Sequence, residues 1–156
     1  MPPTLEEIAA RLQALEDREA IRELIARYGP LADTGDAQGV AALWTSDGSY
    51  AVGGMTEAKG RTAIAALIEG HVHQQLMADG CAHALGPVTI DLDGDTATAR
   101  GYSIVFRADG DGGFGVARAS ANRWTLTRTG DGWRVTRREN ALLDGAEAAR
   151  LLLRGS

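Results

Sequence analysis

Two residues of this chain, Asp33 and His83, have the side chains needed to move a proton near neutral pH. The ordinary pKa of an imidazole lies close to neutrality, and a buried carboxylate can fix its tautomer and stabilise its protonated form. Such a pair can take a proton from a carbon next to a carbonyl or leaving group and return it elsewhere. The two positions are far apart in the sequence, so the fold must bring them together.

The first of these residues follows an amphipathic helical segment. Asp17 is a plausible N-cap, and the apolar residues after it recur at helical spacing, as do those before it on one face. Gly29-Pro30 is expected to kink or end this helix, because proline lacks a backbone donor and crowds the preceding turn. Asp33 then lies near its C-terminal end. The apolar residues of the two stretches are Ile8, Leu12 and Leu15, then Ile21, Leu24, Ile25 and Tyr28.

Two further helices and one short strand are expected before His83. A short helix covers about residues 36–44, the Ser46-Asp47-Gly48 turn follows, and a strand runs from Ser49 to Val52 before the Gly53-Gly54 loop. A third helix begins after Gly60 and continues to Gly80, with an apolar stripe on one side.

Beyond Cys81 the apolar period changes from helical spacing to alternation, which is typical of strands. Turns at 93–95 and 130–132 and a glycine-rich loop at 109–113 separate these strands, and a short helix is expected over 146–153. The predicted architecture is an α+β fold, in which helices gather on one face of a curved antiparallel sheet that wraps a pocket. The expected strands cover residues 88–92, 96–107, 117–129 and 133–142.

Length and composition limit the class of protein. With 156 residues the chain is predicted to form one domain, with a core over about 15–142 and a short tail at 143–156. The net charge is −5 and the arginines are scattered, which argues against nucleic acid as a partner. No apolar run is long enough to cross a membrane. A single cysteine, Cys81, and the lack of a signal-peptide pattern favour the cytoplasm.

Several short motifs, in this order, resemble the nuclear transport factor 2-like superfamily and, within it, the SnoaL-like and scytalone dehydratase-like group. The resemblance covers roughly residues 15–142 and implies a cone-shaped fold enclosing a pocket. The fold hosts dehydratases, isomerases, cyclases and non-catalytic proteins, so it does not by itself decide the activity. The motifs are Asp17-Arg18-Glu19-Ala20-Ile21, Arg27-Tyr28 with Asp33 and Asp36, Leu43-Trp44-Thr45-Ser46-Asp47-Gly48, His83 before the 88–95 segment, and Asp131-Gly132-Trp133.

The resemblance also implies roles for individual residues. Asp33 and His83 fall where the dehydratases of this group carry their catalytic dyad. Residues expected to bind substrate or to donate hydrogen bonds to developing negative charge are Tyr28, Tyr50, Ser120, Asn122 and Arg138. The second pocket histidine of scytalone dehydratase has no counterpart in this comparison, because His71 and His73 lie on the helix before His83.

The function expected from these residues is that of a cofactor-independent lyase or isomerase, similar to a dehydratase or polyketide cyclase, that acts on a mostly apolar cyclic small molecule. This chemistry needs no metal or organic cofactor, and the histidines and the cysteine do not form a zinc pattern, so none is expected. As in relatives, a homo-oligomer, dimer or trimer, is expected.

Other interpretations remain open. The protein could be a non-catalytic binding protein of the same fold, or the small subunit of a ring-hydroxylating oxygenase. Asp33 could be a solvated turn residue and His83 an ordinary core histidine. The alternation of Ser120 and Asn122 also suits a solvent-facing strand, and Arg138 could pair with a surface carboxylate.

Overall fold

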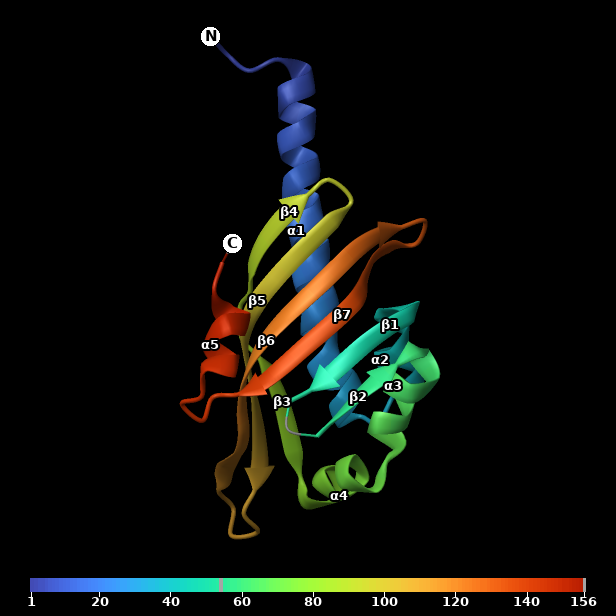
Figure 1. The fold of residues 1–156 in the computed structure, drawn as a ribbon, viewed down its shortest axis with the longest axis vertical. Coiled ribbons are helices and arrows are strands. Elements are labelled where there is room, and N and C mark those ends of the chain that lie inside the picture. Colours follow the sequence, from blue (N-terminus) through green and yellow to red (C-terminus); the bar gives the residue numbers. More distant parts are fainter. Residues whose placement is uncertain (54, 156) are drawn as a thin grey trace.

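The fold is a bent β-sheet with a long helix running along it and shorter helices packed around it (Figure 1). The computed structural model describes residues 1–53 and 55–155; Gly54, in the predicted Gly53-Gly54 loop, and Ser156 lie outside the described residues. The α+β class and the curved sheet are confirmed. The sheet has seven strands in the order β2-β1-β7-β6-β5-β3, with β4 also paired to β5. The strands are β1 (Trp44–Val52), β2 (Thr56–Lys59), β3 (Cys81–Leu85), β4 (Thr89–Asp93), β5 (Thr96–Ala108), β6 (Phe114–Thr129) and β7 (Gly132–Leu142).

The pairing of β5 explains how the sheet curves around a space. The first half of β5 pairs with β4 and its second half with β3, so one long strand serves two short partners. The register shifts between Val105 and Phe106 where β5 meets β6, and again between Thr125 and Leu126 where β6 meets β7. Such irregularities bend a strand and increase its twist. Among the pairs, β1 and β7 run parallel and the others antiparallel.

In the described part of the chain, four helices precede the long strands and one follows them. Helix α1 contacts β3, β4 and β7, whereas α3 contacts β1 and β2. Helix α5 packs on the outer side of the sheet, where Arg123 donates a hydrogen bond to the backbone carbonyl of Leu151. The helices are α1 (Leu5–Asp33), α2 (Ala37–Ala42), α3 (Gly60–Glu69), α4 (His71–Asp79) and α5 (Glu147–Leu153).

Helix α1 is continuous from Leu5 to Asp33, so the predicted N-cap at Asp17 is wrong, and the helix does not end at Gly29-Pro30, which was one of the two outcomes expected there. Asp17 is buried and accepts hydrogen bonds from both terminal nitrogens of Arg128, at 2.8 and 2.7 Å, and from Trp133 Nε1 at 3.1 Å. These partners stabilise the carboxylate inside the helix and remove the need for a cap. The helix begins instead at Thr4, whose side chain and Glu7 form a capping box.

Three other local predictions need correction. The Ser46-Asp47-Gly48 segment belongs to β1, where the pairing with β7 is irregular between Trp44 and Ser49. The helix expected between Gly60 and Gly80 is divided at Gly70, whose extended backbone lies between α3 and α4. Residues 81–85 and 56–59 form strands that the apolar pattern did not predict, because both are short and only partly buried.

The core lies between α1, α3 and the concave side of the sheet. Ile21, Ile64 and Trp124 are fully buried there, together with Trp44, whose indole donates a hydrogen bond to the carbonyl of Ser49. Within residues 1–53 and 55–155, no helix combines the length and the apolar character that a membrane crossing requires.

Candidate active site

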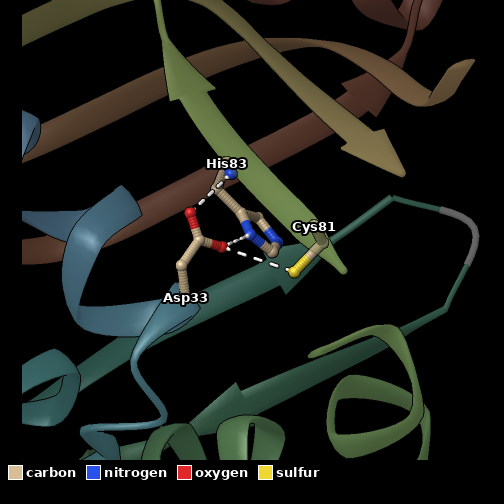
Figure 2. Close-up of side chains that lie close together, drawn as sticks. All are labelled: Asp33, Cys81 and His83. Carbon is tan, nitrogen blue, oxygen red and sulfur yellow. Dashed lines mark hydrogen bonds and ion pairs between the residues drawn. The ribbon is translucent and has the colours of Figure 1, made fainter. Parts of the chain in front are cut away.

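Asp33 and His83 contact each other through two hydrogen bonds (Figure 2). The ring nitrogen Nδ1 of His83 lies 2.6 Å from Asp33 Oδ1, and the backbone N–H of His83 donates to Asp33 Oδ2 at 2.9 Å. An ionised carboxylate only accepts hydrogen bonds, so Nδ1 carries the proton in the neutral ring. The lone pair of neutral His83 is therefore on Nε2, which has no protein partner within the described residues.

The local sequence makes this contact possible. Asp33 is the last residue of α1, and His83 is the central residue of β3. A β-carbon placed on Gly29 would lie 2.2 Å from the carbonyl oxygen of His83, so only glycine permits this approach of helix to strand. Pro30 does not interrupt the helix. Gly29 thus brings the end of α1 against the strand that carries His83.

The surroundings of His83 keep its ring neutral at neutral pH. Burial lowers the pKa of His83 below 6.5, the neighbouring His73 and Arg138 act in the same direction, and Asp33 opposes them. A neutral imidazole can accept a proton, whereas an imidazolium cannot. The side chains of His83 and Asp33 are 13% and 23% exposed, so the pair is largely shielded from solvent.

Cys81 is a third member of this cluster. Its Sγ lies 3.5 Å from Asp33 Oδ1, in a geometry in which the thiol donates to the carboxylate. Burial, and then the charge of Asp33, raise the pKa of Cys81 to about 11, so the thiol stays protonated. The potential metal-binding atoms of Asp33, Cys81 and His83 lie within 4.8 Å of one another. The hydrogen bonds to Asp33 account for this clustering.

The dyad adjoins a pocket of about 410 Å³ between α3, α4 and the concave face of the sheet. This volume is in the range of small-molecule sites. His83 lines the pocket, whereas Asp33 lies behind it and does not. Most of the wall is apolar: Val52, Leu67, Ile68, Val72, Leu76, Leu85 and Val105.

Three of the predicted binding residues, Tyr28, Tyr50 and Arg138, also line the pocket. The guanidinium carbon of Arg138 lies over the rings of Tyr28, Tyr50 and Trp124, at 4.2, 4.5 and 4.1 Å from their centroids. Arg138 is only 2% exposed and has no carboxylate partner among the described residues, so the surface ion pair considered from the sequence does not form. Aromatic faces stabilise the buried cation in place of an acid.

The other two predicted residues, Ser120 and Asn122, are buried and support the pocket from behind. Asn122 Oδ1 accepts hydrogen bonds from Arg138 Nε at 2.9 Å and from Asn140 Nδ2 at 3.2 Å, and its amide nitrogen donates to Ser103. Ser120 accepts a hydrogen bond from Arg118 at 3.2 Å. The predicted alternation of these two residues therefore faces the interior, and neither is among the residues that line the pocket.

His73 and Arg118 line the pocket but were not predicted as site residues from the sequence. His73 was assigned to a continuous helix that carried it away from His83, but α4 begins after the break at Gly70 and places the two rings 5.4 Å apart. His73 Nε2 lies 2.8 Å from the carbonyl oxygen of Ala32, to which it must donate. Arg118 was missed because the first residues of β6 have no clear apolar alternation.

Comparison with known families and structures agrees with this architecture. A family model described as a SnoaL-like domain matches residues 13–139. No protein of the curated set matches the chain.

Solved structures include similar proteins from Novosphingobium aromaticivorans. An NTF2-like protein with a cystatin-like fold is 63% identical, with a TM-score of 0.96 over 99% of this chain and 100% of that chain. A protein described as a candidate aromatic ring hydroxylase is 28% identical, with a TM-score of 0.69 over 83% of this chain and 90% of that chain. A candidate scytalone dehydratase is 21% identical, with a TM-score of 0.67 over 81% of this chain and 84% of that chain, which shows the shared fold alone.

Proposed function

This chain belongs to the SnoaL-like domain family, and we propose that it is a cofactor-independent lyase or isomerase in which His83 is the general base. The observation that carries the proposal is the 2.6 Å contact between His83 Nδ1 and Asp33 at the wall of an apolar pocket. This contact places the proton of neutral His83 on Nδ1 and leaves Nε2 as the basic atom of the ring. The substrate class that suits this wall is a mostly apolar cyclic compound with an acidic C–H bond.

The proposed reaction starts with proton transfer to His83 Nε2. The electron pair of the broken C–H bond passes into the adjacent carbonyl, giving an enolate, and Asp33 stabilises the imidazolium that forms. Donation of the same proton to a departing hydroxyl group releases water, while donation to another carbon gives an isomer. Attack of the enolate carbon on a second carbonyl would instead close a ring, so the substrate decides the product.

Arg138 and Tyr28 are suited to stabilise the enolate oxygen. Both line the same pocket as His83, and the Tyr28 ring packs edge-on against the His83 ring at 6.3 Å. A positive charge in surroundings of low polarity is more effective than the same charge in water. The guanidinium is held in place by Asn122, so it need not reorganise during the reaction.

The proposal is tested with simple cyclic ketones that require only this chemistry. Loss of water from 3-hydroxycyclohexanone and isomerisation of 3-cyclohexenone both form a conjugated enone, whose absorbance is followed. We expect the wild type to accelerate at least one of them, and His83→Ala and Asp33→Asn to reduce the rate by roughly 100-fold or more. Asp91→Asn, which removes a surface carboxylate paired with Arg100, is the control and should keep the rate.

Failure of the wild type to accelerate either reaction, or equal rates in wild type and His83→Ala, would contradict the proposal for these substrates. Binding of cyclic ligands without any proton exchange from their α-carbon in D₂O would favour the alternative of a non-catalytic binding protein. The similarity to a candidate aromatic ring hydroxylase supports a third role, as a subunit of an oxygenase, and co-purification with a large iron–sulfur subunit would favour that role.

A further inference from the structure

The pocket is positively charged although the whole chain carries a net charge of −5. The charged side chains that line it are Arg118 and Arg138, and no aspartate or glutamate of the described residues does so. Three histidines, His71, His73 and His83, share the same wall. A cavity with this charge balance is suited to a ligand that carries an anionic group.

Arg138 differs from the other arginines by its burial. Among the described residues, six other arginines form ion pairs with carboxylates and seven form none, as do Arg118 and Arg138, but only Arg138 is buried. Arg138 Nη1 is buried without any hydrogen-bond partner. A buried guanidinium without a counter-ion is costly to maintain, and a bound anion would offset that cost. The paired surface arginines are Arg27, Arg100, Arg107, Arg128, Arg137 and Arg154.

Arg118 is held in position by neutral acceptors. Its Nη2 donates to the carbonyl of Gly53 at 2.7 Å and to Asn140 Oδ1 at 2.8 Å, and its Nε donates to Ser120 Oγ at 3.2 Å. The remaining nitrogen, Nη1, has only Met55 Sδ at 4.0 Å. Arg118 therefore has one nitrogen free for a ligand, on a side chain already fixed by three other contacts.

The two guanidinium groups are connected by amides. Asn140 accepts from Arg118 and donates to Asn122, and Asn122 accepts from Arg138. The first residues of α4 line the pocket as well, and no side chain caps this helix N-terminus. The partial positive charge at the start of a helix adds to the field of the arginines.

From this arrangement we infer that the ligand of the pocket is an apolar ring compound carrying a carboxylate group, and that Arg118 Nη1 is the anchor of that carboxylate. The apolar wall suits the ring, and a planar carboxylate matches a guanidinium better than a spherical anion does. The inference rests on the proposed function for the placement of the reacting carbon at His83. It adds that the substrate is charged before the reaction starts.

Two probes of nearly equal shape, 2-naphthoate and neutral 2-naphthamide, test this inference by isothermal titration calorimetry. We expect the wild type to bind the carboxylate roughly 10-fold more tightly than the amide, as one charge-assisted hydrogen bond would give. Arg118→Met should abolish this preference without weakening amide binding. Arg118→Lys should keep part of it, and Arg134→Met, which removes the same charge outside the pocket, should keep all of it.

Equal binding of the two probes by the wild type, binding of neither, or a preference that survives in Arg118→Met would overturn the inference. Its failure is distinguishable from failure of the proposed function, because ligand binding does not require proton transfer. Tighter carboxylate binding without turnover would support the inference and contradict the enzyme. Turnover of neutral ketones without a preference for the carboxylate probe would support the enzyme and contradict the inference.

A second observation concerns the N-terminal half of α1, which extends beyond the sheet (Figure 1). Leu5, Ile8, Leu12 and Leu15 form an apolar stripe there and are 47–85% exposed. At about 100° per residue, the centre of this stripe lies about 180° from the side that buries Ile21 and the later core residues. The stripe thus faces away from the protein's own body, where a partner can reach it.

The spacing and charges of this segment fit a second copy of the same helix. Leu5, Ile8, Leu12 and Leu15 follow the alternating spacing of three and four residues that is typical of coiled coils. In a parallel pair, Arg11 of one helix would face Glu16 of the other. In an antiparallel pair, arginines would face arginines and glutamates would face glutamates. Among the described residues, neither Arg11 nor Glu16 has an ion-pair partner in its own chain.

We propose that the protein forms a parallel homodimer through residues 5–16 of α1. Sedimentation equilibrium over a range of concentrations should show a dimer for the wild type and a monomer for Leu12→Glu. Arg11→Glu and Glu16→Arg should each weaken the dimer, and the double exchange should restore it. A monomeric wild type, or a dimer that tolerates Leu12→Glu, would contradict this proposal.

Discussion

Asp33 accepts hydrogen bonds from both the backbone N–H and the ring Nδ1 of His83, so one carboxylate fixes both the strand and the side chain of His83. The backbone bond ties the end of α1 to β3, and the ring bond sets the tautomer. The dyad is therefore part of the contact between two elements and depends on the packing that brings them together.

Gly29→Ala is expected to disrupt the dyad without changing either of its members. The new β-carbon would meet the His83 carbonyl oxygen at 2.2 Å, so α1 and β3 must separate. We expect a loss of about 1–3 kcal/mol in the free energy of unfolding and a large fall in rate, measured by urea denaturation and the enone assay. Gly115→Ala, where a β-carbon would meet nothing within 4 Å, is the control. A fully active, stable Gly29→Ala would show that the close approach is unimportant.

Asp17→Asn is expected to destabilise the fold by about 1–3 kcal/mol, because the buried carboxylate accepts from Arg128 and Trp133. Asp95→Asn removes a carboxylate from the same arginine at an exposed position and should cost less than about 1 kcal/mol. Equal losses in the two variants, measured by denaturation at neutral pH, would contradict the importance of burial here.

Asp17 should also contribute to acid unfolding. Its hydrogen bond with Arg128 lowers the pKa of the carboxyl from 3.8 to about 2. The stabilisation is complete above pH 3.8, where the carboxyl is ionised in both states, and is lost as the pH falls toward 2. Over this interval the wild type should lose more stability than Asp17→Asn does. Parallel stability curves for the two proteins would argue against the lowered pKa.

Asn122→Asp is expected to reduce the rate by roughly 10-fold or more while preserving the fold. The substitution keeps the shape and the acceptor that Arg138 Nε uses at 2.9 Å, but it gives the buried guanidinium a carboxylate partner. The neutralised arginine would then stabilise an enolate less well. An unchanged rate in a folded variant, verified by its thermal transition, would remove Arg138 from the proposed reaction.

The pH dependence of the rate should reflect neutral His83. Because burial lowers the pKa of His83, the fall of kcat/KM in acidic solution should have its midpoint below pH 6.5. The rate falls at low pH because protonated His83 cannot accept a proton from the substrate. A fall in kcat/KM that is already half complete above pH 6.5 would contradict this environment.

The Asp33–His83 contact could be predicted because both residues stand in motifs that resemble the family. Such short motifs can be recognised even when the register of the strands is unknown. It misplaced Asp17 because the local pattern suggested a cap, whereas the carboxylate binds Arg128, 111 residues away. Helical periodicity concerns residues a few positions apart, so it cannot predict a partner at that separation. His73 and Arg118 were not predicted for related reasons. The direction of the His73 side chain depends on the helix break at Gly70, and that of Arg118 depends on the register at the start of β6.

The exposed apolar stripe of α1 shows a further limit of periodicity. Ile8 and Leu12 repeat at helical spacing as well as Ile21 and Leu24 do, yet only the second pair is buried. Amphipathic spacing predicts that a face will be covered, but the covering surface can belong to the same chain or to another one.

The coupling of Asp33 to His83 is tested most directly by an NMR titration of His83 in the wild type and in Asp33→Asn. We expect a wild-type pKa below 6.5 with the proton on Nδ1 in the neutral ring. We also expect a lower pKa in Asp33→Asn, because the carboxylate that stabilises the imidazolium has been removed. The same pKa and the same tautomer in both proteins would show that Asp33 and His83 are not coupled, and would contradict the proposed mechanism.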